Sequence, residues 1–199
     1  MAPKLGVAPV RREQIIQATI RCLVRDGASG LRMKAVAREA KVSQGILHYY
    51  FTNKRAMLIA VLETVMADLN RRLAKLLGSA HDPRARLRAV IKGCLDLADE
   101  NSPFWIVFVE FWGEMMHDQE LLRFNAALYR QARRMLSALV VEGARSGFFR
   151  RIDPEEAGAV ILALVDGVSL QRTFDPKAFT REHATRFCEE AIRRYLEKR

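Results

Sequence analysis

The sequence predicts an all-α protein of about nine helices, with a small helix-turn-helix domain at the N-terminus and a larger helical domain after it. Three observations lead to this prediction. Apolar residues recur at helical spacing along nearly the whole chain, and no alternating stretch of useful length favours a strand. Proline follows a polar capping residue at several points, which is typical of helix starts. The net positive charge is concentrated in the first quarter of the chain.

The first three predicted helices lie close together in the sequence. The first carries one apolar stripe and meets Gly27, which can take the left-handed conformation that ends a helix. A short helix over residues 34–40 is followed by the three-residue turn 41–43 and by a third helix over residues 44–51, with Ser43 as its N-cap. The residues predicted to point inward are Ile15, Ala18, Thr19, Cys22, Leu23, Val36, Ala37, Ala40, Val42, Ile46, Leu47 and Tyr50.

The remaining helices are delimited by capping residues, prolines and glycines. Asn53 can cap a long helix that ends at Gly78, and Asp82-Pro83, Ser102-Pro103 and Asp153-Pro154 each predict a helix start. A further long helix is expected over residues 118–146, and the last begins near Thr180. We therefore expect two domains, residues 1–55 and residues 56–199.

The placement of charge points to the partner of the first domain. The whole chain has a formal net charge of +10, and residues 1–55 hold eleven basic against three acidic side chains, a net +8. Such an excess favours a polyanion, because neutralising phosphates with counterion release supplies affinity for nucleic acid. A solvated basic face and a contact with an anionic membrane surface are the alternatives.

Residues 34–51 match the bihelical unit that presents a helix to the major groove of double-stranded DNA. Small residues at Ala37 and Gly45 would let the two helices approach closely. The exposed edge of the second helix would carry Gln44, which can pair with adenine, and His48 and Tyr49, which can bind phosphates. Lys54 at the next helix start would clamp a phosphate. Tyr50 fits the core and the DNA surface equally well.

The run from Met33 to Lys54, with Gly27 before it and Leu58 after it, resembles the N-terminal motif of the TetR family of repressors. The resemblance implies a DNA-binding head, a helical body that binds a small-molecule effector and forms a homodimer, and release from a palindromic operator when the effector binds. Lys41 stands where the family usually has Gly, and His48 where it usually has Tyr. The residues predicted to contact DNA are Lys34, Ser43, Gln44, Gly45, His48, Tyr49, Tyr50 and Lys54.

An aromatic helix over residues 104–117 is the most distinctive part of the body. It holds five of the sixteen aromatic residues of the chain. Trp105, Phe108, Trp112 and Met116 fall on one stripe, which favours either ordinary core packing or a wall that binds a cation. Glu110, Glu114 or Asp166 could supply a carboxylate for that cation.

Part of the chain also resembles the BetI-type, choline-responsive branch of the TetR family. The similarity lies in residues 3–12, in Phe111-Trp112 and Met116-His117, and in Asp166-Gly167-Val168-Ser169-Leu170, although Ser169 replaces an expected aromatic residue. The resemblance implies choline as a candidate effector.

The last two predicted helices carry the candidate dimer interface, because small residues let a partner helix approach and a broad apolar face follows. The predicted interface residues are Gly158, Ala163, Gly167, Phe187, Ala191 and Tyr195. Part of these faces is also expected to close the core of the monomer.

Other function classes find no support in the sequence. The histidines lack metal-ligand spacing, and no nucleophile motif or nucleotide-binding loop occurs, so we expect no metal, no cofactor and no enzymatic activity. The three separated cysteines, the absence of a secretory signal and the charged break at Asp166 predict a cytoplasmic protein without a membrane span. Two alternatives stay open: a helical small-molecule-binding protein or enzyme whose basic N-terminus is incidental, and an architectural DNA-binding protein without an effector.

Overall fold

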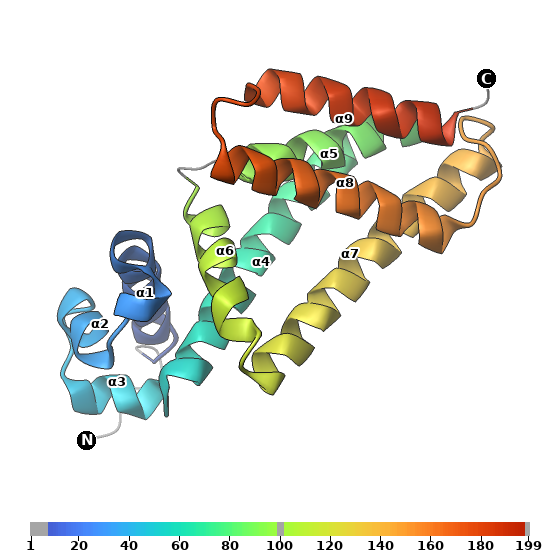
Figure 1. Cartoon of the computed structure of the whole chain (residues 1–199). Helices are drawn as coiled ribbons and strands as arrows, with labels where there is room; N and C mark the ends of the chain where they lie inside the picture. Colours follow the sequence, from blue (N-terminus) through green and yellow to red (C-terminus); the bar gives the residue numbers. More distant parts are fainter. Residues whose placement is uncertain (1–7, 99–101, 198–199) are drawn as a thin grey trace. The chain divides into compact units, whose positions relative to one another are not determined.

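The computed structural model describes residues 8–98 and 102–197, and within this part of the chain it contains nine α-helices and no strand (Figure 1). The predicted fold class is confirmed. Residues 3–7, on which part of the resemblance rests, lie outside the described residues. The helices are α1 (Ala8–Gly30), α2 (Met33–Glu39), α3 (Gln44–Tyr50), α4 (Lys54–Ser79), α5 (Pro83–Leu97), α6 (Pro103–Met115), α7 (Gln119–Arg145), α8 (Pro154–Phe174) and α9 (Arg181–Leu196).

Side-chain caps start most of these helices where the sequence predicted them. Asn53 Oδ1 accepts from Ala56 N at 2.8 Å at the start of α4, and Asp82 Oδ1 accepts from Ala85 N at 2.9 Å at the start of α5. Asp153 caps α8 by accepting from two backbone amides. Each cap satisfies an amide that has no partner inside its own helix, which explains why the predicted starts are accurate.

The chain divides into two compact units. The first contains residues up to 68 together with residues 103–124, and the second contains residues 69–102 together with residues 125–199. The aromatic helix α6 belongs to the first unit because it packs along α1. Val107 and Phe111 of α6 are fully buried in the same apolar core as Ile15 and Leu23 of α1.

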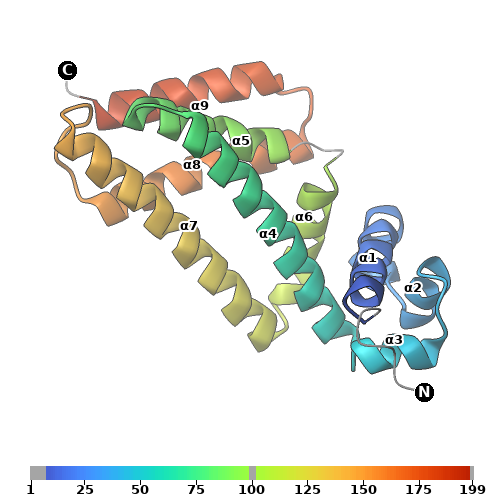
Figure 2. The same cartoon turned by 180° about the vertical axis from the view of Figure 1, so that it is seen from behind.

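Polar contacts hold α2 to α1 inside the first unit. The Glu39 carboxylate forms ion pairs with Arg21 Nε at 2.8 Å and with Arg25 Nη1 at 3.3 Å. The two guanidinium groups hold the pKa of Glu39 below its usual range. Gln14 Nε2 donates to the carbonyl oxygen of Ala40 at 2.8 Å, which satisfies the C-terminal end of α2. In both ribbon views α3 lies at one edge of this unit, below α1 and α2 (Figures 1 and 2).

Gly27 behaves differently from the sequence prediction. Its φ of 70° is positive, as expected, but its ψ of 174° is not that of a left-handed helix end. This combination is accessible essentially to glycine alone. The chain therefore kinks at Gly27 and resumes helical structure as far as Gly30, instead of ending the helix.

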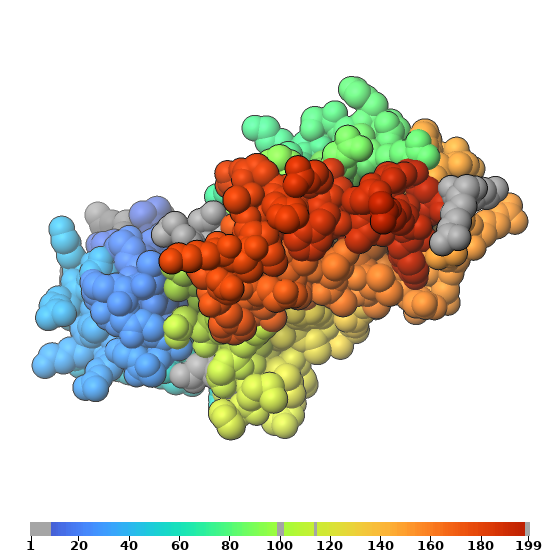
Figure 3. Space-filling model, turned by 45° about the horizontal axis from the view of Figure 1, so that its top comes forward, coloured from blue at the N-terminus to red at the C-terminus, as the bar shows by residue number. Residues whose placement is uncertain are grey.

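In the second unit, α8 and α9 pack on α5, and the red helix α9 lies on the surface of the unit (Figure 3). Its buried core includes Ile161 and Val165 of α8 and Cys188 and Ile192 of α9. By length and composition α8 could cross a membrane, and 33% of the relevant window is buried inside the protein. A single helix of this kind is weak support for a membrane span, and its exposed apolar residues call for another explanation.

Candidate nucleic-acid interface and internal polar cluster

The helix α3 has one buried side and is otherwise open to solvent. Leu47 is fully buried and Tyr50 is half-buried against the core of the first unit, while Gln44, His48 and Tyr49 are exposed. Ser43 Oγ accepts from Ile46 N at 3.2 Å and so caps the helix as predicted. The edge predicted to read DNA is therefore free within the residues that the structure describes.

Two predictions about α3 were wrong. Ile46 was expected in the core but is 42% exposed, because about 100° per residue turns it away once Leu47 is centred on the buried side. Gly45 was expected to permit close helix packing, yet a Cβ there would meet only Ser43 Oγ at 3.9 Å. Both residues therefore lie on the open surface of α3.

Several basic side chains of the first unit remain available to a ligand. Arg12, Lys34 and Lys41 make no ion pair with any described residue, and all three are exposed. Arg12 lies with its guanidinium carbon 5.4 Å from the centre of the Phe51 ring, immediately after α3. Lys41 has a φ of 53° and is the only described non-glycine residue with a positive φ. Lys41 thus places an unpaired charge before the start of α3, and Arg12 places one near its end.

Lys54 is placed differently from the other basic residues of the predicted DNA surface. Its Nζ donates to the carbonyl oxygen of Ala28 at 2.9 Å, and the side chain is half-buried. The ammonium group therefore already holds the end of α1.

Four aromatic residues of α6 form a continuous cluster along one side of the helix, while Phe111 lies in the core shared with α1. The ring centre of Phe108 lies 5.9 Å from Phe104, 6.0 Å from Trp105 and 5.5 Å from Trp112. Trp105 is buried, whereas Met116, which was predicted to continue the stripe, follows the end of the helix and is 75% exposed.

The predicted carboxylates lie in different surroundings. Glu110 Oε2 accepts from the backbone amide of Ala28 at 2.8 Å, so this carboxylate is engaged with α1. The side chain of Glu114 lies outside the described residues. Asp166 lies in the second unit, where burial raises the pKa of its carboxyl and a hydrogen bond from Tyr129 partly opposes that shift.

Sequence reasoning missed the neighbours of Asp166. Burial raises the pKa of the Tyr129 hydroxyl, with the Asp166 charge adding to the effect, and burial beside the same charge raises the pKa of the Cys94 thiol to about 12. Asn125 lies one turn before Tyr129 on α7, and its Oδ1 is buried without a hydrogen-bond partner among the described residues, as is Nη1 of Arg172. The signal available in the sequence was the polar pair Asn125 and Tyr129 at i, i+4 spacing.

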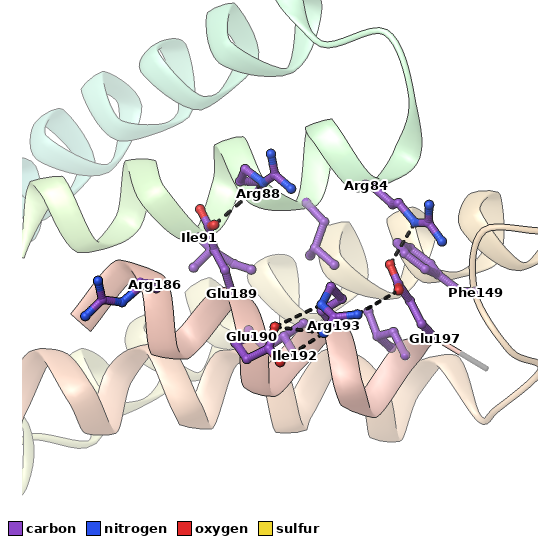
Figure 4. A pocket seen from close by; sticks show the side chains of 12 residues that line it. Arg84, Arg88, Ile91, Phe149, Arg186, Glu189, Glu190, Ile192, Arg193 and Glu197 are labelled. Carbon is purple, nitrogen blue, oxygen red and sulfur yellow. Dashed lines mark hydrogen bonds and ion pairs between the residues drawn. The ribbon is translucent and has the colours of Figure 1, made fainter. Parts of the chain in front are cut away.

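The second unit also has a groove of about 420 Å³ between α5 and α9 (Figure 4). None of the predicted effector residues lines it. Most of its charged residues form ion pairs: Arg84 Nε lies 2.7 Å from Glu197, and Arg88 Nε lies 3.6 Å from Glu189. Arg186 also lines the groove and has no ion pair with a described residue.

The predicted dimer residues fall into three groups. Gly158 is buried, and a Cβ there would lie 2.7 Å from Ser137 Oγ and 2.9 Å from the Arg133 carbonyl oxygen, so it serves packing of α8 on α7 in the same chain. Ala163 and Ala191 are exposed, and a Cβ at Gly167 would meet nothing within 4 Å. Phe187 and Tyr195 are half-buried; Phe187 packs edge-on against Phe179 and Tyr195 lies under Arg150.

Two family models match the chain. Residues 15–61 match the model described as bacterial regulatory proteins of the tetR family, and residues 83–197 match the model of the C-terminal part of BetI-type transcriptional repressors. The first match covers α2 and α3, and the second begins at the start of α5.

Known proteins resemble the chain over most of its length. The HTH-type transcriptional regulator BetI of Burkholderia thailandensis is 35% identical over 185 residues, which cover 88% of this chain and 91% of the relative. A TetR transcription regulator from Haloarcula marismortui has the same fold, with a TM-score of 0.86 at 23% identity over 95% of this chain and 100% of its own. A transcriptional regulator from Saccharomonospora viridis, solved in complex with choline, gives a TM-score of 0.84 at 23% identity over 94% and 98% of the two chains.

Proposed function

This chain belongs to the TetR family of bacterial regulatory proteins and to its BetI type, and from that premise we propose that it represses transcription as a homodimer on a palindromic operator until a small cation releases it. The observation that carries the proposal is the exposed edge of α3, held by a capped helix start and a fully buried Leu47. A rigid helix with one open edge is what a major groove can accept.

Within that edge we assign different roles to different residues. Gln44 reads bases, because its amide can form two hydrogen bonds with adenine. Ser43, Gly45, His48 and Tyr49 lie beside it on the exposed surface and contact the sugar-phosphate backbone, while Tyr50 contributes from the half-buried side. Lys34, Lys41 and Arg12 add unpaired positive charge, which gives salt-dependent affinity for any DNA sequence.

The effector that we propose is a small cation, with choline as the first compound to test. The family match and the choline complex of the Saccharomonospora viridis regulator support this choice. In this chain, the buried Asp166 of the second unit offers a carboxylate to a cation. The clustered rings of Trp105, Phe108 and Trp112 in the first unit are a separate candidate surface for a quaternary ammonium group. A bound cation would favour the charged form of Asp166, which burial otherwise disfavours.

The homodimer is proposed to form through the exposed side of α8 with help from α9. Val160, Ala163, Gly167 and Phe174 recur at helical spacing on α8 and are exposed or half-exposed, and Phe174 is 79% exposed. Small residues at the centre of such a face let two copies of the helix approach closely. An interface of this kind also accounts for the apolar character of α8 without a membrane.

We further propose that the protein acts in the cytoplasm and catalyses no reaction. The relatives are transcriptional regulators, and cysteines at positions 22, 94 and 188 are free, as expected in a reducing compartment. Burial raises the pKa of all three thiols, which disfavours the nucleophilic thiolate.

The proposal is tested with the purified protein and the DNA upstream of its own gene. Fluorescence anisotropy at several salt concentrations should give a saturable, salt-dependent affinity that choline at millimolar concentration weakens, and Asp166→Asn should reduce the response to choline. If the protein bound this DNA no more tightly than a random fragment, the proposal that an operator lies there would be contradicted. DNA binding that no small cation changes would instead favour an architectural role.

A further inference from the structure

One backbone residue, Ala28, is held by side chains from two other helices of the first unit. Its N–H donates to Glu110 Oε2 of α6 at 2.8 Å, and its carbonyl oxygen accepts from Lys54 Nζ of α4 at 2.9 Å. The Ala28 side chain is itself buried. Both polar groups of a single residue at the kink of α1 are therefore bound by side chains of opposite charge.

The kink at Gly27 explains why this position needs outside partners. The non-helical ψ of 174° at Gly27 interrupts the hydrogen-bond ladder of α1, so the amide of Ala28 begins a new helical turn. A carboxylate is a strong acceptor for an amide at the start of a helical turn. Glycine is required at position 27 by the backbone angles, and a Cβ there would also lie 3.2 Å from Glu110 Oε2, so the carboxylate would have to shift slightly.

A second contact binds the next residue of α4, Arg55, to the segment that joins α6 to α7. Arg55 Nε bonds to Asp118, which follows α6 and caps the start of α7 by accepting from Glu120 N at 2.9 Å. Arg55 Nη1 also lies 3.6 Å from Glu120. The consecutive residues Lys54 and Arg55 thus bind the kink of α1 and the start of α7.

The position of Glu110 on α6 gives this arrangement a consequence for DNA binding. At about 100° per residue, Glu110 lies on nearly the opposite side of α6 from Trp105 and Trp112. One side of α6 carries the aromatic cluster, and Glu110 on the other side binds the end of α1. A shift of α6 that lengthens the bond from Ala28 N to Glu110 Oε2 would weaken the attachment of α1, against which α2 is packed, and α2 in turn carries the reading helix α3.

We propose that Glu110 is a positioning residue for DNA binding: its carboxylate holds the Ala28 amide and thereby fixes α1 and the reading head to α6. This role differs from that of an effector ligand, because the carboxylate acts on the protein's own backbone in the absence of any small molecule. The proposal rests on the DNA-binding function of the family and is independent of the identity of the effector.

The test compares Glu110→Ala and Glu110→Gln, with Glu63→Ala on the exposed side of α4 as the matched control. Hydrogen exchange of the peptide containing Ala28 is measured first. The Ala variant should exchange the Ala28 amide at least about tenfold faster, since its acceptor is lost, whereas the Gln variant keeps a carbonyl oxygen and should restore most of the protection. The control should exchange like the wild type.

Affinity for the upstream DNA, without any effector, is the second measurement. It should fall about tenfold in the Ala variant, recover in the Gln variant and stay unchanged in the control. Unaltered exchange and affinity in the Ala variant, or a Gln variant as impaired as the Ala variant, would overturn the proposal. If the wild type bound no DNA, the operator assignment would fail, and the exchange experiment would still decide whether Glu110 holds Ala28. Should Glu110→Ala not fold, Glu110→Asp, whose shorter side chain withdraws the carboxylate from the Ala28 amide, provides the second variant.

Discussion

The backbone N–H of Val42 donates to the carbonyl oxygen of Ala37 at 2.9 Å and closes the turn between α2 and α3. A second bond runs from Lys41 N to the Arg38 carbonyl oxygen at 3.1 Å. These two bonds define a Schellman motif, in which the first residue after the helix cap takes the left-handed conformation. Here that residue is Lys41, with a φ of 53°, where glycine or asparagine is usual.

Replacing Lys41 with glycine should therefore stabilise the protein. A residue with a Cβ costs about 1 kcal/mol or more in the left-handed region, and the greater freedom of glycine in the unfolded chain offsets part of the gain. We expect the free energy of unfolding of Lys41→Gly, measured by urea denaturation, to rise by up to about 1 kcal/mol. Lys41→Ala keeps the strain and removes the charge, so a gain in both variants would argue against this explanation.

Substitutions at Ser43 separate helix capping from DNA binding. Ser43→Ala removes the acceptor for Ile46 N and should lower the free energy of unfolding by about 1 kcal/mol. Ser43→Asp keeps an acceptor and should preserve stability, but it adds a negative charge beside the phosphates and should weaken DNA binding most at low salt. The two variants are compared by thermal melting and anisotropy. If Ser43→Asp and the wild type bound DNA with equal affinity, Ser43 would not be part of the DNA interface.

The local rules of helix formation made most of the fold predictable. Asp82 and Asp153 can be recognised as helix caps because each is a polar residue directly before a proline. This signal is local and needs no knowledge of the rest of the chain. The bond between Glu110 and Ala28 joins residues 82 positions apart, so no local pattern could predict it. The pairing of Asp166 with Tyr129 was missed for the same reason, since it depends on how α7 and α8 are placed within the second unit.

The exposed edge of α3 predicts a change in sequence preference for Gln44→Ala. Because the Gln amide is the group suited to adenine, its removal should relax specificity at one operator position by about 1–3 kcal/mol. Affinity for random DNA should change little. Selection from a randomised operator library measures this, with Gln131→Ala on the exposed side of α7 as the control. An unchanged preference would mean that α3 does not read bases through Gln44.

The buried carboxyl of Asp166 predicts a pH dependence of stability. Its pKa is raised in the folded protein, so between the ordinary value of about 3.9 and the raised value the native state holds a proton that the unfolded chain has lost. The free energy of unfolding contributed by this group is greatest at low pH and falls as the pH rises through that window.

Asp166→Asn should remove this titration. The difference in free energy of unfolding, variant minus wild type, should increase with pH through the window and then level off, as measured by urea denaturation at a series of pH values. Tyr129→Phe removes the hydrogen bond that lowers the pKa of Asp166 and should extend the window upward. A difference for Asp166→Asn that stayed constant with pH would show that the carboxyl is not perturbed.

The exposed side of α8 provides a test of the dimer. Ala163 lies near the middle of this side, so Ala163→Asp would place two like charges against each other across a two-fold interface. We expect dimerisation, measured by analytical ultracentrifugation, to weaken at least about tenfold, since an unpaired charge in an apolar interface is costly. Affinity for a palindromic operator should fall with it, whereas affinity for an isolated half-site should not. Ala127→Asp, on the exposed side of α7, is the matched control and should remain dimeric. A dimeric Ala163→Asp variant would move the interface away from this part of α8, because no helix packed closely at that position could accept the added carboxylate.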